Sequence, residues 1–544
     1  MPSFPKYTGP YDVGTTDVEI PKDELDATLS MPECTAATSL FRIFYPCERQ
    51  HKSIKKRSAP VRWVQEPQFR TAHGYARYLG ASDAMATVFS SLSSLLYYIN
   101  IPATQDAPLH SRDSPNGRWP VMVFSHGLAG SRNTYSQLCG SLASYGVVVI
   151  APEFRDGSCA VTRVSGTDHN KPHFIDYQHI SFDFCPEVHE ARDAQLRTRI
   201  AELVLIHTAL VKIDKGQVFT NLLSSTSQNV LAMFRGMLDI HEPGGITWAG
   251  HSFGGTTTIQ FLKSVFYSDE VSTPLMPYQP PSSLKAQITT RSAAILLDAW
   301  GLPLRSPYTS ALKEKPMPCF SPSGPGGSSL LSILSEAFFK WPENLLVILD
   351  VLSDPKDLDH RVSCPDVLDE KFPVQAENPR PQAHIFYPIS TAHISQSDFG
   401  LLFPTLMRYV LGAKAAEPER TMRLNVRAIL EVMRQRGTHV SAVSAYDREE
   451  LLSLESSCGE KCEKSLQDGR GDVRILSREE GAVRGWIAVH AREAARDAYE
   501  LERSERERRR VSVIEQGVGG LLTERLNTET SLGETVMSGG KGAS

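Results

Sequence analysis

Short, mainly apolar runs alternate with longer stretches of helical length through most of the chain, and the run 147–151 is apolar throughout. The runs predicted to be strands are 40–45, 119–124, 147–151, 246–249, 293–297 and 384–387. The stretches predicted to be helices are 133–145, 187–213, 254–267 and 395–411. A run that is apolar at every position suits a parallel strand that is covered on both faces. This alternation predicts an α/β fold with a mostly parallel central sheet flanked by helices.

An amphipathic stretch at 85–99 precedes most of this alternation. Its apolar positions are Met85, Val88, Phe89, Leu92, Leu95, Leu96 and Ile99. Their spacing places them on one face of a helix. Tyr97 and Tyr98 lie at its end, so this face is a candidate for transient contact with a membrane surface. Packing of the same face on the protein core explains the pattern equally well.

Two segments break the alternation, and a third follows it. Segments 268–290 and 315–329 are rich in Pro or Gly and are predicted to be long surface loops. From about residue 413 the chain becomes strongly charged. We therefore expect one α/β domain over 1–412, and a charged extension over 413–544 that is partly helical and partly disordered.

Composition narrows the class of protein. The chain has 544 residues, 41% of them hydrophobic and 22% charged, which is typical of a globular protein. A formal net charge of −5 gives no bulk attraction to nucleic acid. Nine cysteines, a sparse and odd number, argue against a disulfide framework and favour a reducing compartment.

Targeting and cofactor motifs are missing from the sequence. The segment 1–6 has no apolar core of a signal peptide, Pro2 excludes N-myristoylation, and no run of about 18 apolar residues occurs. We therefore expect a soluble, cytoplasmic protein. No phosphate-binding loop or zinc spacing is present, and the Cys458–Cys462 pair stands alone in the charged extension. The sequence thus predicts neither a metal nor a cofactor.

The pentapeptide 250–254 reads Gly-His-Ser-Phe-Gly and lies between a predicted strand and a predicted helix. A serine in this G-x-S-x-G context sits on a tight turn, with its hydroxyl exposed at the edge of the sheet. The following helix N-terminus favours negative charge developing nearby. Ser252 is therefore the candidate nucleophile of an α/β-hydrolase fold.

Serine at its ordinary pKa is a weak nucleophile and needs a base oriented by an acid. In this fold the acid follows the nucleophile along the chain, and the base comes last. Asp298 directly follows the strand 293–297, so it is the candidate acid. Asp350 is the rival, but the Pro342-Glu-Asn that precedes its apolar run is more typical of a helix start.

The candidate base is His393, because it lies in a loop between the last predicted strand and the last predicted helix. The other histidines after Asp298 are His360, His384, His439 and His490. His384 begins a strand, and His439 and His490 lie in the extension.

Two backbone amides are needed to hold an oxyanion. One is the N–H of Phe253, the residue after the nucleophile, and the other is assigned to Leu128 in the glycine-containing turn 125–130. His126 is expected to brace this turn rather than act as a base. Glu153-Phe-Arg-Asp156 is expected to form structural ion pairs after a strand.

With these residues placed, the chain resembles the platelet-activating-factor acetylhydrolase family, in its single-chain plasma and intracellular type II group, also called group VII phospholipases A2. The segments that carry the resemblance are 8–14, 123–130, 153–156, 250–255, 297–300 and 392–399. By that resemblance, the nucleophile is Ser252, the acid Asp298 and the base His393. It likewise implies that the Leu128 and Phe253 amides form the oxyanion hole.

The resemblance implies calcium-independent hydrolysis of short or oxidised sn-2 acyl groups of phospholipids. A general carboxylesterase acting on soluble short-chain esters needs the same residues, so it remains an alternative, and a non-catalytic α/β-hydrolase scaffold is a third. The insertion at 268–290 and the extension after 413 depart from the family pattern. The expected partner is a phospholipid, and the oligomeric state is left open.

Overall fold

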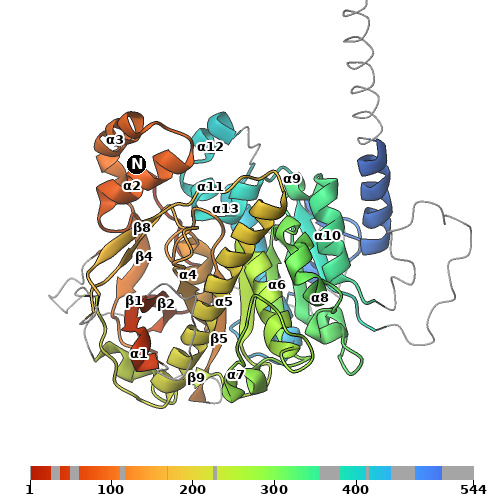
Figure 1. The fold of residues 1–544 in the computed structure, drawn as a ribbon, viewed down its shortest axis with the longest axis horizontal. Coiled ribbons are helices and arrows are strands. Elements are labelled where there is room, and N and C mark those ends of the chain that lie inside the picture. Colours follow the sequence, from red (N-terminus) through yellow and green to blue (C-terminus); the bar gives the residue numbers. More distant parts are fainter. Residues whose placement is uncertain are drawn as a thin grey trace, which may run out of the picture.

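The computed structural model describes residues 2–25, 37–48, 60–110, 117–167, 170–223, 229–355, 380–411, 416–442 and 472–504. Its main feature is one large twisted sheet with helices on both faces (Figure 1). No helix in the described part of the chain is long and apolar enough to cross a bilayer. His360, Cys458 and Cys462 lie outside these ranges.

The strands run from the N-terminus to residue 488. They are β1 Asp12–Pro21, β2 Thr38–Cys47, β3 Pro60–Arg62, β4 Asn100–Gln105, β5 Trp119–Ser125, β6 Val148–Pro152, β7 Val161–Val164, β8 His173–Asp176, β9 Leu238–Asp239, β10 Thr247–His251, β11 Ala293–Leu297, β12 Leu330–Ile333, β13 His384–Pro388 and β14 Trp486–Ala488. The main sheet has the order β14-β13-β12-β11-β10-β5-β6-β2-β1-β4-β3. Its centre, from β6 to β13, is parallel, and β2 joins it antiparallel.

Helices cover both faces of the sheet. They are α1 Lys22–Leu25, α2 Gln68–Tyr78, α3 Asp83–Leu92, α4 Ser136–Ser144, α5 Pro186–Asp214, α6 Phe253–Phe266, α7 Ser282–Gln287, α8 Ser310–Lys313, α9 Glu336–Phe339, α10 Pro342–Leu352, α11 Asp398–Leu402, α12 Pro404–Leu411 and α13 Pro418–Gln435. Val121 and Val123 of β5 join the core under α5 and α6, whereas Met122 and Phe124 join the core under α4 and α13. This alternation of side chains builds the two-sided core that the apolar runs predict. The predicted α/β fold, with a mostly parallel central sheet flanked by helices, is confirmed.

The apolar pattern does not predict strand β1, which pairs with β2 over its full length. Its buried positions include Asp17 and Glu19, which a hydrophobic pattern reads as exposed. Both carboxylates are paired with buried arginines, Asp17 with Arg42 and Glu19 with Arg155. Paired charges therefore replace apolar residues in this strand.

The amphipathic stretch at 85–99 forms α3 and continues as the 3-10 helix η1, Ser93–Tyr98. The apolar face of this stretch is largely exposed rather than packed on the core, with Leu92 78% and Leu95 69% accessible. The predicted helix at 395–411 is instead three short helices: the 3-10 helix η8, His393–Gln396, then α11 and α12. Pro404 opens α12, and its missing N–H separates that helix from α11.

The two predicted insertions are long loops with short helices, but they are not confined to the surface. Leu275 and Leu284 of the first insertion are fully buried. Met317 and Phe320 of the second are also buried. These side chains complete the core under α6 and α5.

The boundary predicted at 412 falls within the folded body. Helix α13 buries most of one side against the sheet, and its Leu424 and Ile429 are inaccessible. Strand β14 then pairs antiparallel with β13 at the sheet edge. The high charge of this region predicts a separate extension. In the structure, the charged residues of α13 alternate with apolar positions that pack inward, so the helix belongs to the folded domain. The segments 443–471 and 505–544 lie outside the described residues.

Candidate active site

Ser252 occupies a sharp turn between β10 and α6. Its φ of 56° and ψ of −121° depart from the conformations that a non-glycine residue favours. The turn is fixed by the neighbouring strand, because the Ser252 N–H donates to the Leu297 carbonyl at 2.9 Å. The Trp300 N–H donates in turn to the Ser252 carbonyl at 3.1 Å. A strained, well-braced serine at a strand end is the geometry of a nucleophile elbow.

Two glycines of the pentapeptide make this turn possible. A Cβ at Gly250 would lie 2.2 Å from the Gly254 carbonyl oxygen, and a Cβ at Gly254 would lie 2.0 Å from the Ser125 carbonyl oxygen. Neither position leaves room for a side chain. The spacing of the G-x-S-x-G motif therefore follows from the contact between β5, the turn and the first turn of α6.

Asp298 and His393 are in contact. The Nδ1 atom of His393 lies 3.1 Å from Oδ2 of Asp298, which is fully buried at the end of β11. The other Asp298 oxygen accepts the N–H of Ser335, two residues beyond the end of β12. The bond at Nδ1 leaves Nε2 of His393 available for a proton.

The rival residues lie elsewhere. Asp350 is exposed on helix α10, as the Pro342 helix start predicts. His384 begins β13, while His439 and His490 are exposed in the segments that follow α13. Among the described histidines after Asp298, His393 is the one bonded to it.

The ring of His393 is held between two other rings. Phe338 of α9 stacks on one side with ring centroids 4.2 Å apart, and His251 stacks on the other at 4.4 Å. Ser335 begins α9 by accepting the Phe338 N–H, so the residue that bonds Asp298 also positions Phe338. Neither Phe338 nor Ser335 belongs to a motif that sequence reasoning could use, because they follow the short, unpredicted strand β12.

The two amides proposed for an oxyanion lie in the expected turns. Phe253 is the first residue of α6, and Leu128 lies in the turn after β5. Neither N–H donates a hydrogen bond to another residue that the structure describes. A Cβ at Gly127 would approach the Ser252 Cβ to 3.0 Å, so this turn packs directly against the nucleophile. Both amides are therefore candidates for binding an oxyanion near Ser252.

His126 braces the turn, as the sequence predicts. Its Nε2 accepts the Phe154 N–H at 3.2 Å, and its Nδ1 lies 2.8 Å from the Gly127 carbonyl oxygen, to which it donates. Burial lowers the pKa of His126 to about 4, so the ring is neutral near pH 7. A buried neutral ring with both nitrogens engaged has a structural role.

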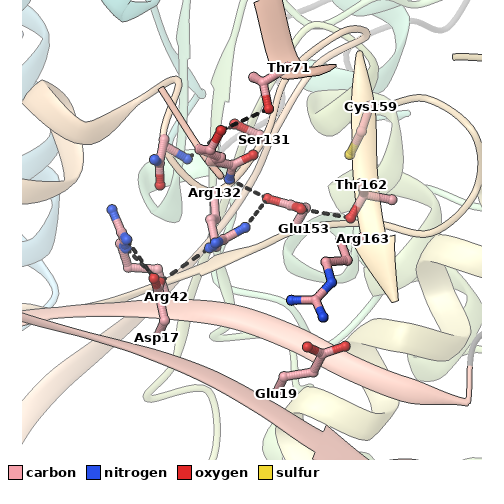
Figure 2. Close-up of polar contacts among 12 residues, drawn as sticks. Asp17, Glu19, Arg42, Thr71, Ser131, Arg132, Glu153, Cys159, Thr162 and Arg163 are labelled. Carbon is pink, nitrogen blue, oxygen red and sulfur yellow. Dashed lines mark hydrogen bonds and ion pairs between the residues drawn. The ribbon is translucent and has the colours of Figure 1, made fainter. Parts of the chain in front are cut away.

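A buried ion network lies under the same turn (Figure 2). Arg132 joins two carboxylates, Asp17 of β1 at 3.2 Å and Glu153 at 2.5 Å. Glu153 also accepts the Thr162 hydroxyl at 2.6 Å. Burial alone would raise the pKa of Asp17, but Arg42 and Arg132 outweigh it and hold that pKa well below the ordinary value. The network fixes the turn to the antiparallel end of the sheet.

The remaining charges of the 153–156 segment are paired as expected. Arg155 binds Glu19 at 3.0 Å, and Asp156 binds Arg199 of α5 at 2.7 Å. Arg199 also donates to the His126 carbonyl at 2.8 Å. These are structural ion pairs, as predicted, and they link α5 to the turn beside Ser252.

The side chains of this site that could ligate a metal ion are already engaged in hydrogen bonds. Within the described ranges, the group of side chains close enough to share a metal ion is His251, Asp298 and His393. Both oxygens of Asp298 and both nitrogens of His251 already have hydrogen-bond partners in the protein. The donor set therefore suits proton transfer and orientation.

The strand order, with a serine elbow between β10 and α6 and an Asp–His pair at the same edge, defines an α/β-hydrolase. The model of the family "Platelet-activating factor acetylhydrolase, isoform II" matches residues 2–448. The chain belongs to that family. Membership in this family supports the assignment of the protein as a carboxylic ester hydrolase.

Individual relatives are distant. A Schizosaccharomyces pombe protein named "Putative phospholipase A2" is 28% identical over 81% of this chain and 93% of its own length. The platelet-activating factor acetylhydrolases of Cavia porcellus and Canis lupus familiaris are 29% and 25% identical, over 48% and 65% of this chain and 52% and 64% of their own lengths. A ferulic acid esterase structure from Streptomyces cinnamoneus covers 90% of this chain and 99% of its own, at 14% identity and a TM-score of 0.49.

Proposed function

We propose that this protein is a calcium-independent serine hydrolase that removes short or oxidised sn-2 acyl groups from phospholipids. 1-Alkyl-2-acetylglycerophosphocholine is the type substrate. The proposal combines the family with the strained turn at Ser252 and the contact between Asp298 and His393. The choice of a phospholipid as the substrate is supported by a separate observation, an exposed apolar surface.

The proposed reaction has two steps. His393 takes the Ser252 proton at Nε2 as Oγ attacks the ester carbonyl, and Asp298 orients the ring and stabilises its positive charge. The amides of Leu128 and Phe253 hold the oxyanion, and collapse of the tetrahedral intermediate releases the lyso-lipid, which takes its proton from His393. Water activated by the same histidine then attacks the acyl-enzyme and releases the short acid.

An exposed apolar face favours a phospholipid over a soluble ester as the substrate. It comprises Phe69 and Leu79 in and after α2, Met85, Val88, Phe89 and Leu92 of α3, Leu95 and Tyr98 of η1, and Leu406 and Tyr409 of α12. Figure 1 shows α2, α3 and α12 along the upper edge of the molecule, the edge that also carries α9. No charged residue occurs from 84 to 105. This uncharged part of the apolar face suits contact with a lipid surface.

Contacts tie this face to the site. The Tyr75 hydroxyl of α2 lies close to the side chain of Ser131, in the segment that follows the oxyanion turn. Tyr75 also packs edge-on against Phe399 of α11, with ring centroids 5.1 Å apart, which joins α2 to the helices after His393. A lipid surface lying on this face would therefore be close to the nucleophile.

The alternative is a general short-chain carboxylesterase, which needs the same three side chains. The test compares hydrolysis of a short-acyl choline phospholipid in vesicles with that of a soluble nitrophenyl ester, with EDTA present. We expect turnover of both, a large preference for the lipid, and loss of both in Ser252→Ala. Turnover of the soluble ester alone would favour the general esterase, and no turnover of either by folded protein would reject the enzyme assignment.

A further inference from the structure

His251, the variable second residue of the pentapeptide 250–254, lies between the oxyanion turn and His393. It is buried, and both of its ring nitrogens have partners. Nδ1 lies 2.7 Å from the hydroxyl of Tyr135, and Nε2 lies 3.2 Å from the backbone carbonyl oxygen of His393. The side chain next to the nucleophile thus contacts the segment that carries the candidate base.

The proton positions along this chain of contacts are determined by its ends. The Gly127 N–H donates to the Tyr135 oxygen at 3.1 Å, and the Tyr135 hydroxyl has a single hydrogen to give. That hydrogen goes to Nδ1 of His251, because the carbonyl of His393 can only accept. His251 is therefore the neutral tautomer that carries its hydrogen on Nε2 and donates it to His393.

Stacking adds a second constraint. The rings of His251 and His393 lie 4.4 Å apart at 29°, while Phe338 lies nearly parallel on the far side of His393. The backbone of His393 is thus held by a hydrogen bond and its ring plane by two neighbours. Rotation of the ring away from Asp298 would have to displace one of them.

Neutrality of His251 matters for the charge that catalysis creates. Burial, together with the neighbouring His393, lowers the pKa of His251 well below the ordinary value. A second positive charge in contact with His393 would oppose its conversion to imidazolium. A neutral ring has no such effect, and it keeps its Nδ1 free to accept from Tyr135.

We infer that His251 is a positioning residue that couples the oxyanion turn, through Tyr135 and Gly127, to the placement of His393. This inference rests on the proposed function. It goes beyond the proposed triad because it assigns a task to the residue beside the nucleophile and to Tyr135 of the segment before α4. Its prediction is a loss of turnover without a loss of substrate affinity.

The test measures kcat and KM for a soluble nitrophenyl ester in His251→Phe, His251→Gln and Tyr135→Phe. Phenylalanine keeps a stacking ring but removes both hydrogen bonds, and we expect kcat to fall roughly 10- to 100-fold with KM within about twofold. Glutamine can place an amide N–H near the position of Nε2, so it should recover most of kcat. Tyr135→Phe should lower kcat in the wild-type background and have little further effect beside His251→Phe.

His207→Gln is the matched control, since His207 is also buried but lies on α5. A fluorophosphonate that labels wild-type Ser252 and not Ser252→Ala establishes the nucleophile independently. If wild type is neither labelled nor active, the proposed function fails. If wild type is labelled and active, but His251→Phe keeps kcat within twofold or changes only KM, the inference about His251 fails alone. Should His251→Phe not fold, Tyr135→Phe decides by the same criteria, since it removes the hydrogen bond to Nδ1 of His251.

Discussion

Asp298 and His393 are 95 positions apart in the sequence, yet Oδ2 of Asp298 lies 3.1 Å from Nδ1 of His393. The Ser335 N–H holds the second carboxylate oxygen of Asp298, so the carboxylate faces the imidazole in a fixed orientation. This arrangement keeps the proton of His393 on Nδ1 and presents Nε2 as a base. The chemistry we propose depends on that tautomer.

Replacing Asp298 by Asn tests this dependence. The amide keeps the shape of the side chain, but its NH₂ can donate to Nδ1 and select the opposite tautomer. We expect kcat for a nitrophenyl ester to fall by about 10⁴-fold with KM little changed. Stopped-flow measurement of acyl-enzyme formation should show the loss in the acylation step. A variant that keeps more than a tenth of wild-type kcat would refute the orienting role of Asp298.

Arg132 is predicted to be essential for stability. Replacing it by Met leaves the carboxylates of Glu153 and Asp17 with fewer positive partners in a buried region. Removing one member of a buried ion pair costs roughly 3–5 kcal/mol. Urea unfolding should therefore show a lower free energy of unfolding, and Arg70→Met, which breaks the exposed pair with Asp176, should show a loss of less than about 1 kcal/mol. Equal losses in the two variants would contradict the importance of the buried network.

The same network predicts sensitivity to acid. Burial alone would raise the pKa values of Asp17 and Glu153. The neighbouring arginines outweigh burial, so both carboxylates have a pKa below the ordinary value. A carboxylate with a depressed pKa in the folded state contributes stability that is present above its unfolded pKa of about 4 and is lost as the pH falls below it. The free energy of unfolding should thus decline below about pH 4. In Asp17→Asn that decline should be shallower, and an unchanged slope would rule out a contribution from Asp17.

The apolar face formed by α2, α3, η1 and α12 predicts binding to uncharged lipid surfaces. Leu92→Ser with Leu95→Ser should weaken binding to phosphatidylcholine vesicles by at least roughly tenfold, because each leucine loses its apolar contact with the lipid. Co-sedimentation measures this directly. The loss of binding caused by the two leucine substitutions should be similar at low and high salt, since residues 84–105 carry no charge.

Val218→Ser is the control for that prediction, because Val218 is an equally exposed apolar residue beyond the end of α5. It should leave vesicle binding unchanged. If both variants bind vesicles like the wild type, the exposed face is not the lipid contact. Turnover of a soluble ester, which needs no lipid surface, provides the internal reference for both.

The sequence could predict the centre of the sheet because its strands are apolar at nearly every position. β5, β6, β10 and β11 all lie where such runs are found. Asp298 and His393 could be chosen because each stands at the end of one of these strands or in the next loop, and the structure brings them into contact. The turn at Ser252 could also be predicted from local sequence, because it directly follows an apolar strand.

The rest could not be found in this way, for two physical reasons. Strand β1 carries buried carboxylates whose partners lie far away in sequence, so its hydrophobic pattern is weak. The roles of His251, Tyr135 and Phe338 arise from contacts between separate segments, such as the Tyr135 to His251 hydrogen bond. A single sequence contains no periodic signal for contacts of that kind.

The most direct test of the central claim is to find the acyl group on Ser252. A rapid acid quench during turnover of 1-alkyl-2-acetylglycerophosphocholine in EDTA, followed by peptide mass spectrometry, should reveal an acetylated peptide that contains Ser252. The adduct and the turnover should both be absent in Ser252→Ala. Lipid turnover that persists in Ser252→Ala, or an acetyl group on another residue during turnover, would contradict the proposed mechanism.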